Sequence, residues 1–118
     1  MARSLLPDPL KRRHLLAGDL DAARARAIAE AYQEEERHNE SIAFLAKAED
    51  EAGLEKLREL AIARGDVFLL REVSTALRAT IDEETWKRTA EAAAAVGLAA
   101  YAEEAHRQGD LLADRRNG

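Results

Sequence analysis

Single glycines divide this 118-residue chain into short segments. Gly18, Gly65 and Gly109 are each followed by an aspartate, and they lie 47 and 44 residues apart. Glycine accepts the left-handed backbone that ends many helices, and aspartate is a preferred N-cap for the helix that follows. The spacing therefore predicts short helices joined by tight turns, with about three helices between successive glycine-aspartate pairs.

A weak internal repeat supports the same interpretation. When Gly53-Leu54 is aligned with Gly97-Leu98, an offset of 44 residues (97 − 53), Glu59 falls on Glu103 and Gly65-Asp66 falls on Gly109-Asp110. Self-similarity at a fixed period is typical of stacked helical repeats. The chain is expected to hold about two such units.

The composition favours an all-α fold in one domain. Hydrophobic residues make up 47% of the chain but aromatic residues only 4%, so the core is expected to consist of alanine-rich helix faces in close contact. β-branched residues are few and scattered, so no strand is predicted. The length suits a single domain over residues 1–118 with a modest core.

Apolar periodicity and capping residues predict where the helices lie. Asp8, Asp66 and Asp82 are expected N-caps, and Val96 and Leu98 are expected to face inward. Residues 1–7 and 110–118 are expected to be loose ends. The predicted helices cover residues 9–17, 20–36, 39–52, 54–64, 67–80, 83–96 and 98–108.

Residues 22–53 resemble a tetratricopeptide repeat. The segment IAEAYQEEERHNESIAFLAKA carries the likeness, with small residues where two helices would cross and a tyrosine between them. A weaker similarity to the helical repeats of coatomer-type coat proteins rests on residues 84–110. Both resemblances imply a right-handed superhelix of about seven short antiparallel helices. The residues at the tetratricopeptide positions are Ala29, Tyr32, Ser41, Leu45 and Ala48.

The resemblance also implies a function and a binding surface. Such proteins are non-enzymatic adaptors that bind a protein or peptide partner, and the first helix of a repeat lines their groove. The competing interpretation is that these positions are ordinary solvated helix residues, and self-association through the end helices is a further possibility. The groove positions carry over to Ala23, Arg26, Glu30, Gln33 and Glu34.

An alternative chemistry comes from two Glu-x-x-His pairs, Glu35 with His38 and Glu103 with His106. Residues three apart share a helix face, and di-iron bundle proteins use this spacing to bring a carboxylate and an imidazole to one metal. Such bundles need long uninterrupted helices, whereas the glycines divide this chain into short ones. We therefore expect no metal, no cofactor and no catalytic residue.

Charge and residue usage exclude other classes. The net charge is −5; Lys and Arg outnumber acids in residues 1–28, and acids outnumber them in residues 29–66. An acidic chain of this kind is not expected to bind nucleic acid, although its basic end could steer a charged partner. There is no cysteine and no apolar run of about 20 residues. We expect a cytoplasmic protein that does not enter a membrane.

Overall fold

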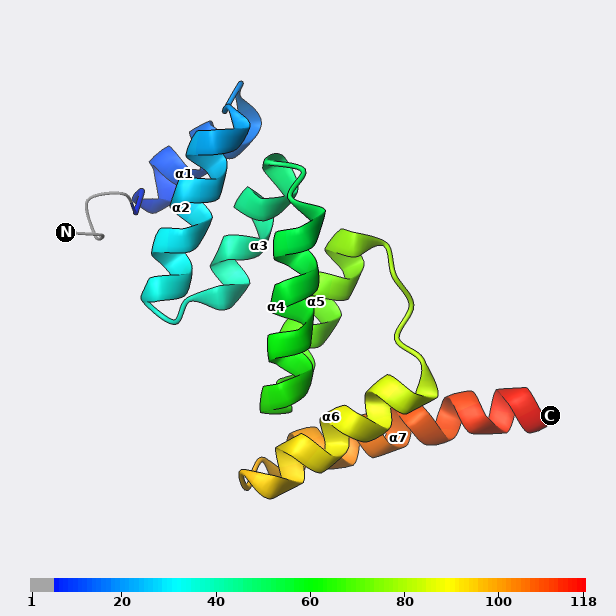
Figure 1. The fold of residues 1–118 in the computed structure, drawn as a ribbon. Helices are drawn as coiled ribbons and strands as arrows, with labels where there is room; N and C mark the ends of the chain where they lie inside the picture. Colours follow the sequence, from blue (N-terminus) through cyan, green and yellow to red (C-terminus); the bar gives the residue numbers. More distant parts are fainter. Residues whose placement is uncertain (1–5) are drawn as a thin grey trace. The chain divides into compact units, whose positions relative to one another are not determined.

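The computed structural model describes residues 6–118, and within them it contains seven helices and no strand (Figure 1). The all-α fold predicted from the sequence is confirmed. No helix in this described part is long and apolar enough to cross a membrane. The helices are α1 (Pro9–Ala17), α2 (Ala22–Glu34), α3 (His38–Lys47), α4 (Glu51–Arg64), α5 (Val67–Leu77), α6 (Glu83–Ala95) and α7 (Ala99–Asn117).

The chain divides into two compact units, Met1–Glu55 and Lys56–Gly118, and the boundary falls inside α4. We call them the first and the second unit and describe each by itself. The right-handed superhelix and the single domain over residues 1–118 stay predictions.

The first unit is built around the pair α2 and α3, which pack side by side, with α1 against α3 (Figure 1). The alanines of α2 let the backbones approach closely, and Ala25 and Ala29 are fully buried. At the end of this contact the Tyr32 and Phe44 rings stack with centroids 5.7 Å apart. The guanidinium of Arg12, on α1, lies 5.3 Å and 5.1 Å from these two centroids and so fastens α1 onto the pair.

The second unit is built around the pair α6 and α7, which lie side by side over most of the length of α6 (Figure 1). The buried stripe of α6 runs through Trp86, Ala90 and Ala93 at helical spacing, and it meets Ala102 and Ala105 of α7. Trp86 is only 5% exposed and belongs to the core of this unit. The α6–α7 contact is thus made of one large side chain and several small ones.

The five helices from α2 to α6 all end in the same way. In each, a residue in the left-handed region closes the turn, with φ between 53° and 79°. After α2, for example, the backbone N–H of Arg37 donates to the carbonyl of Tyr32 (2.8 Å) and that of Glu36 to the carbonyl of Gln33 (2.9 Å). This pair of bonds is the Schellman motif. The left-handed residues are Glu36, Glu49, Gly65, Arg78 and Gly97.

The prediction that single glycines end the helices is therefore only partly right. Gly65 and Gly97 close turns as expected, but Gly18 has an extended backbone with φ −99°. The helix expected to break at Gly53 instead ends at Lys47, and Gly53 lies in the first turn of α4, where its N–H donates to the carboxylate of Asp50 (3.0 Å). Left-handed Glu49 makes the turn in its place.

Two of the predicted N-caps are also wrong. α2 begins after Asp21, whose carboxylate accepts the N–H of Arg24, and not after Asp19. Asp110 lies inside α7, one residue after Gly109. By contrast Asp8, Asp66 and Asp82 each cap a helix as predicted.

The loose end predicted for residues 110–118 is wrong, because α7 continues to Asn117. A glycine inside a helix costs only about 1 kcal/mol relative to alanine. A Cβ at Gly109 would lie 3.5 Å from the Cβ of Trp86, which is an ordinary van der Waals distance. Arg116 then pairs with Glu83 of α6 at 2.9 Å and holds the last turn. At the other end, residues 1–5 of the expected loose segment 1–7 lie outside the described residues.

Candidate functional site

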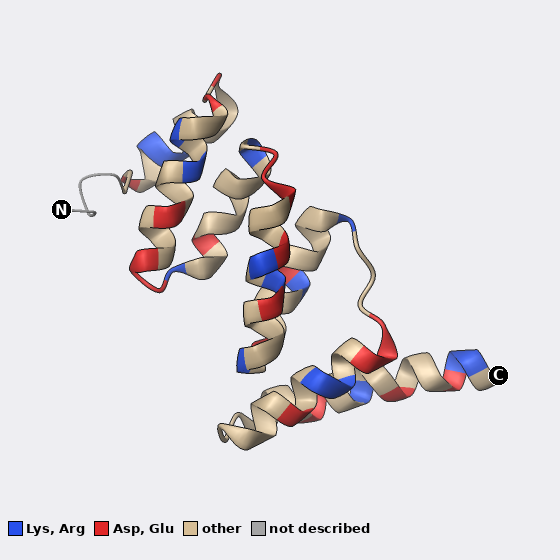
Figure 2. Ribbon diagram, viewed as in Figure 1, with Lys and Arg blue, Asp and Glu red and all other residues tan. Residues whose placement is uncertain are grey.

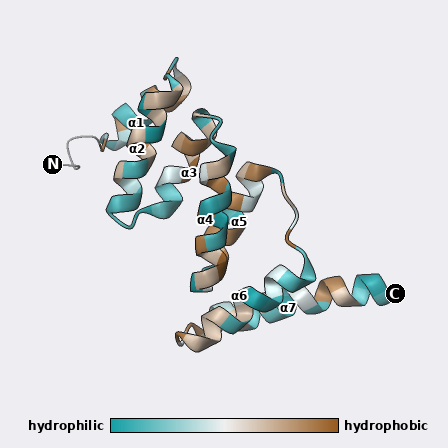
Figure 3. Ribbon diagram, viewed as in Figure 1, coloured by the Kyte–Doolittle hydropathy of each residue, from teal (hydrophilic) through white to brown (hydrophobic). Residues whose placement is uncertain are grey.

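The turn between α6 and α7 exposes seven consecutive uncharged residues, 94–100, with the sequence AAVGLAA. We call this segment the apolar tip. Val96 is 64% exposed and Leu98 41% exposed, although both are large and apolar. Figure 2 shows no charged residue at this turn, and Figure 3 shows it without strongly hydrophilic residues. A cluster of exposed apolar residues on a water-soluble surface commonly marks a site of interaction.

The prediction that Val96 and Leu98 lie on inner helix faces is wrong. The last buried residue of α6 is Ala93, and the left-handed turn at Gly97 carries the chain away from the α6–α7 contact before α7 begins. The signal that could have revealed this surface was the charge-free run itself. In a chain with 35% charged residues, a run of this kind at a helix turn is unusual.

A further exposed apolar residue of the second unit lies at the start of α5. Gly65, in the turn between α4 and α5, is in close contact with the backbone of Ala93 in the last turn of α6. Phe68 lies three residues after Gly65 and is 55% exposed, and Val96 lies three residues after Ala93. The second unit therefore exposes large apolar side chains both at the start of α5 and at the apolar tip.

Acidic residues flank the apolar tip. Glu91 precedes it on α6 and Glu103 follows it on α7, and both are exposed. No lysine or arginine occurs between Arg88 and Arg107. The apolar tip thus has an acidic rim without a neighbouring cation in the sequence, which favours a partner with basic residues around an apolar centre.

A network of charges around Glu104 joins α5 to α7 in the second unit. The carboxylate of Glu104 accepts hydrogen bonds from Arg107, from Arg71 of α5 and from Gln108. The guanidinium of Arg71 also lies 5.6 Å from the Trp86 ring centroid. Hydrogen bonds from Arg107, Arg71 and Gln108 lower the pKa of Glu104 to about 2. This network stabilises the α5–α7 contact only while Glu104 is ionised.

A pH dependence of stability follows from this carboxylate. Because its folded pKa is about 2, below the ordinary 4.5, its contribution is fully present above about pH 4.5 and is lost as the pH falls towards 2. We expect the free energy of unfolding to fall over this range, measured by urea denaturation, and to fall less steeply in Glu104→Gln. The control is Glu103→Gln, which removes an adjacent exposed carboxylate. Equal pH slopes in Glu104→Gln and the parent would contradict the prediction.

The predicted partner-binding face of α2 is largely on the surface. Ala23, Arg26, Glu30 and Glu34 are exposed, and Gln33 is half-buried. Two of the five residues make contacts inside the first unit, because Arg26 Nε lies 3.5 Å from an Asp50 carboxylate oxygen and Gln33 donates to the Ser41 hydroxyl at 3.3 Å. Partner binding by this face stays a prediction.

The geometry required by the metal hypothesis is not present at its first pair. Glu35 is the C-cap of α2 and His38 is the first residue of α3, with left-handed Glu36 between them. The spacing of three therefore does not place them on one helix face; His38 Nε2 instead lies 3.5 Å from Glu36 Oε1. Glu103 and His106 do share α7, and both are exposed.

No group of three or more His, Cys, Asp or Glu residues in the described part of the chain is arranged to hold a metal ion. The exposed surface best defined by geometry is the apolar tip. No protein-family model, curated protein or solved structure matches the chain.

Proposed function

We propose that the chain is a non-enzymatic protein-interaction module that binds a partner protein at the apolar tip. The observation that carries this proposal is the exposure of Val96 and Leu98 within seven consecutive uncharged residues. Burial of apolar surface is the main favourable contribution to most protein association, at about 25 cal/mol per Å². Two large side chains on one turn provide an anchor of this kind.

The rim of the apolar tip defines the chemistry of the partner. Glu91 and Glu103 are both exposed and carry negative charge next to the apolar residues. A partner with an apolar centre surrounded by Lys or Arg complements this arrangement. The contact is expected to form more slowly at high salt, because rim charges act mainly on the association rate.

The likeness of residues 22–53 to a tetratricopeptide repeat supports the same class of function, by analogy with proteins that hold other proteins. The face of α2 is then a second surface for the same or another partner. A resemblance to adaptor proteins does not by itself assign a function. The proposal therefore depends mainly on the exposed residues of the second unit. The proposed residues of the α2 face are Ala23, Arg26, Glu30, Gln33 and Glu34.

The substitution Leu98→Asp tests this proposal with opposite effects on binding and stability. Leu98 is the N-cap of α7 and makes no side-chain capping bond. An aspartate there can accept the N–H groups of the first turn, so we expect stability to rise by about 1 kcal/mol in thermal or urea unfolding. Partner affinity should fall at least tenfold, because the apolar anchor is replaced by a charge.

The matched control is Leu111→Ser. Leu111 is 41% exposed, as Leu98 is, and lies within α7 outside the apolar tip. Parent, Leu98→Asp and Leu111→Ser proteins are immobilised and exposed to an extract of the source cells, and retained proteins are titrated individually. A partner retained by the parent and by Leu111→Ser but lost by the more stable Leu98→Asp supports the proposal. Equal retention by all three proteins would rule it out.

A further inference from the structure

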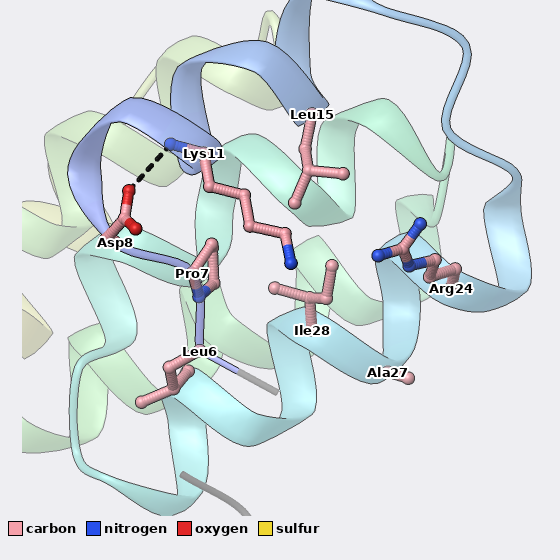
Figure 4. Close-up of a pocket in the computed structure, with 8 residues that line it drawn as sticks. All are labelled: Leu6, Pro7, Asp8, Lys11, Leu15, Arg24, Ala27 and Ile28. Atoms are coloured by element: carbon pink, nitrogen blue, oxygen red, sulfur yellow. Dashed lines mark hydrogen bonds between the residues drawn. The ribbon is translucent and has the colours of Figure 1, made fainter. Parts of the chain in front are cut away.

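The first unit contains a pocket of about 280 Å³ between α1, the residues just before it and the first half of α2 (Figure 4). Five of its eight lining residues are apolar, and Ile28 among them is only 3% exposed. Two cationic side chains enter it, one from each helix. The pocket is lined by Leu6, Pro7, Asp8, Lys11, Leu15, Arg24, Ala27 and Ile28.

The two cations, Lys11 and Arg24, occupy equivalent positions in their helices. Each is three residues after its N-cap aspartate, which accepts its backbone N–H: Asp8 Oδ1 from Lys11 at 2.9 Å and Asp21 Oδ1 from Arg24 at 2.8 Å. The carboxylates are thus engaged by the backbone. Among the described residues, neither Lys11 nor Arg24 forms an ion pair with any acid.

This placement is unfavourable for the helices themselves. The first turn of a helix carries partial positive charge, so acidic residues stabilise it and cations do not. Neither α1 nor α2 has an acidic residue in its first turn. Helix stability therefore does not explain why both helices place an unpaired cation in the first turn, next to the same pocket. The combination points to a negatively charged ligand.

The pocket also selects an apolar group. In Figure 4 the Lys11 ammonium and the Arg24 guanidinium extend towards the same space over Ile28, with Leu15 on the opposite side. Asp8 is the one carboxylate among the lining residues, so the lining carries more positive than negative charge. Figure 2 shows the basic residues of α1 and the start of α2 around this part of the chain. An anion with an apolar body satisfies both the charge and the walls.

We propose that this pocket binds a small organic anion, with its carboxylate or phosphate group held by Lys11 and Arg24 and its apolar body against Leu15 and Ile28. The volume of about 280 Å³ is slightly below the range usual for drug-sized ligands, so the body is short. The site lies in the first unit and uses Arg24, Ala27 and Ile28 of α2, not the predicted partner-binding residues. It is independent of partner binding at the apolar tip.

The test is an NMR titration of the whole chain with octanoate and octyl phosphate, which present the two head groups on one apolar body. We expect saturable shifts of the amide signals of Lys11, Arg24 and Ile28. The tighter of the two ligands identifies the head group. Inorganic phosphate and 1-octanol, each with half of the chemistry, should bind at least tenfold more weakly than that ligand.

Two variants separate this site from general charge effects. The double variant Lys11→Gln with Arg24→Gln should lose at least tenfold in affinity without a lower melting temperature, because it removes cations from two helix N-termini. Arg13→Gln removes an exposed cation of α1 that does not line the pocket and should bind as the parent does. Equal binding of 1-octanol, an equal loss in Arg13→Gln, or the absence of saturable shifts would each overturn the proposal.

Discussion

Gly65→Ala is expected to lower the free energy of unfolding by about 3 kcal/mol or more, the largest effect of any alanine substitution at a glycine of this chain. Two constraints coincide at this position. Gly65 has φ +67°, in the region that residues with a side chain rarely adopt. A Cβ there would also fall well inside van der Waals contact with the backbone nitrogen and Cα of Ala93. Since the obstacle is helix backbone, it cannot rotate away, and α6 must shift.

Gly97→Ala is the matched control for this prediction. Gly97 has φ +79° and closes the same kind of turn, but no atom lies within 4 Å of the place where its Cβ would be. Its substitution should therefore cost only the strain of the backbone, about 1 kcal/mol. The difference between the two variants, measured by urea unfolding, isolates the contact with Ala93. Equal losses would show that this contact contributes nothing.

Gly65 and the aspartate after it show which features of the fold can be predicted from the sequence. Gly65-Asp66 was predicted correctly because the turn needs a glycine for its backbone and the next helix needs an acid as its cap. The caps at Asp8 and Asp82 were also predicted correctly, because each carboxylate accepts a backbone N–H of the helix that follows. Where local chemistry alone determines an element, the sequence is sufficient.

Where contacts between helices determine the position of a turn, the sequence alone is not sufficient to predict it. Glu36, Glu49 and Arg78 adopt the left-handed conformation although each carries a side chain, and nothing in their identity signals a turn. Each turn is held by two backbone hydrogen bonds and by the helices on both sides of it. Gly109 is the reverse case, because this glycine lies inside α7 and does not end it.

The candidate sites also differ in how well the sequence alone could predict them. The α2 face was proposed from resemblance, and its residues are exposed or half-buried, but exposure alone does not distinguish it from a solvated helix. The turn at Gly97 was predicted, but the exposure of Val96 and Leu98 beside it was not. The pocket with Lys11 and Arg24 depends on a cap that the sequence did not give. Asp21, and not Asp19, caps α2, and this choice places Arg24 in the first turn.

The second large effect is expected at the centre of α4. Leu54, Leu57 and Ala61 form a buried stripe at helical spacing, and Leu57 is only 3% exposed. Leu57→Asp removes this apolar side chain and buries a carboxylate without a partner. We expect the free energy of unfolding at pH 7 to fall by about 4 kcal/mol or more, measured by urea denaturation.

The charge and the lost packing in Leu57→Asp can be separated with Leu57→Asn, which has the same shape and no charge. Burial raises the pKa of a carboxyl group, so the penalty of the ionised form is greatest at neutral pH and disappears as the pH approaches the unfolded value, about 3.9. The Asp variant should be about 2 kcal/mol less stable than the Asn variant at pH 7, and the two should converge near pH 4. This sign is opposite to that of Glu104, whose contribution is lost on acidification. Equal stability of the two variants at pH 7 would mean that position 57 opens to water when it carries a charge.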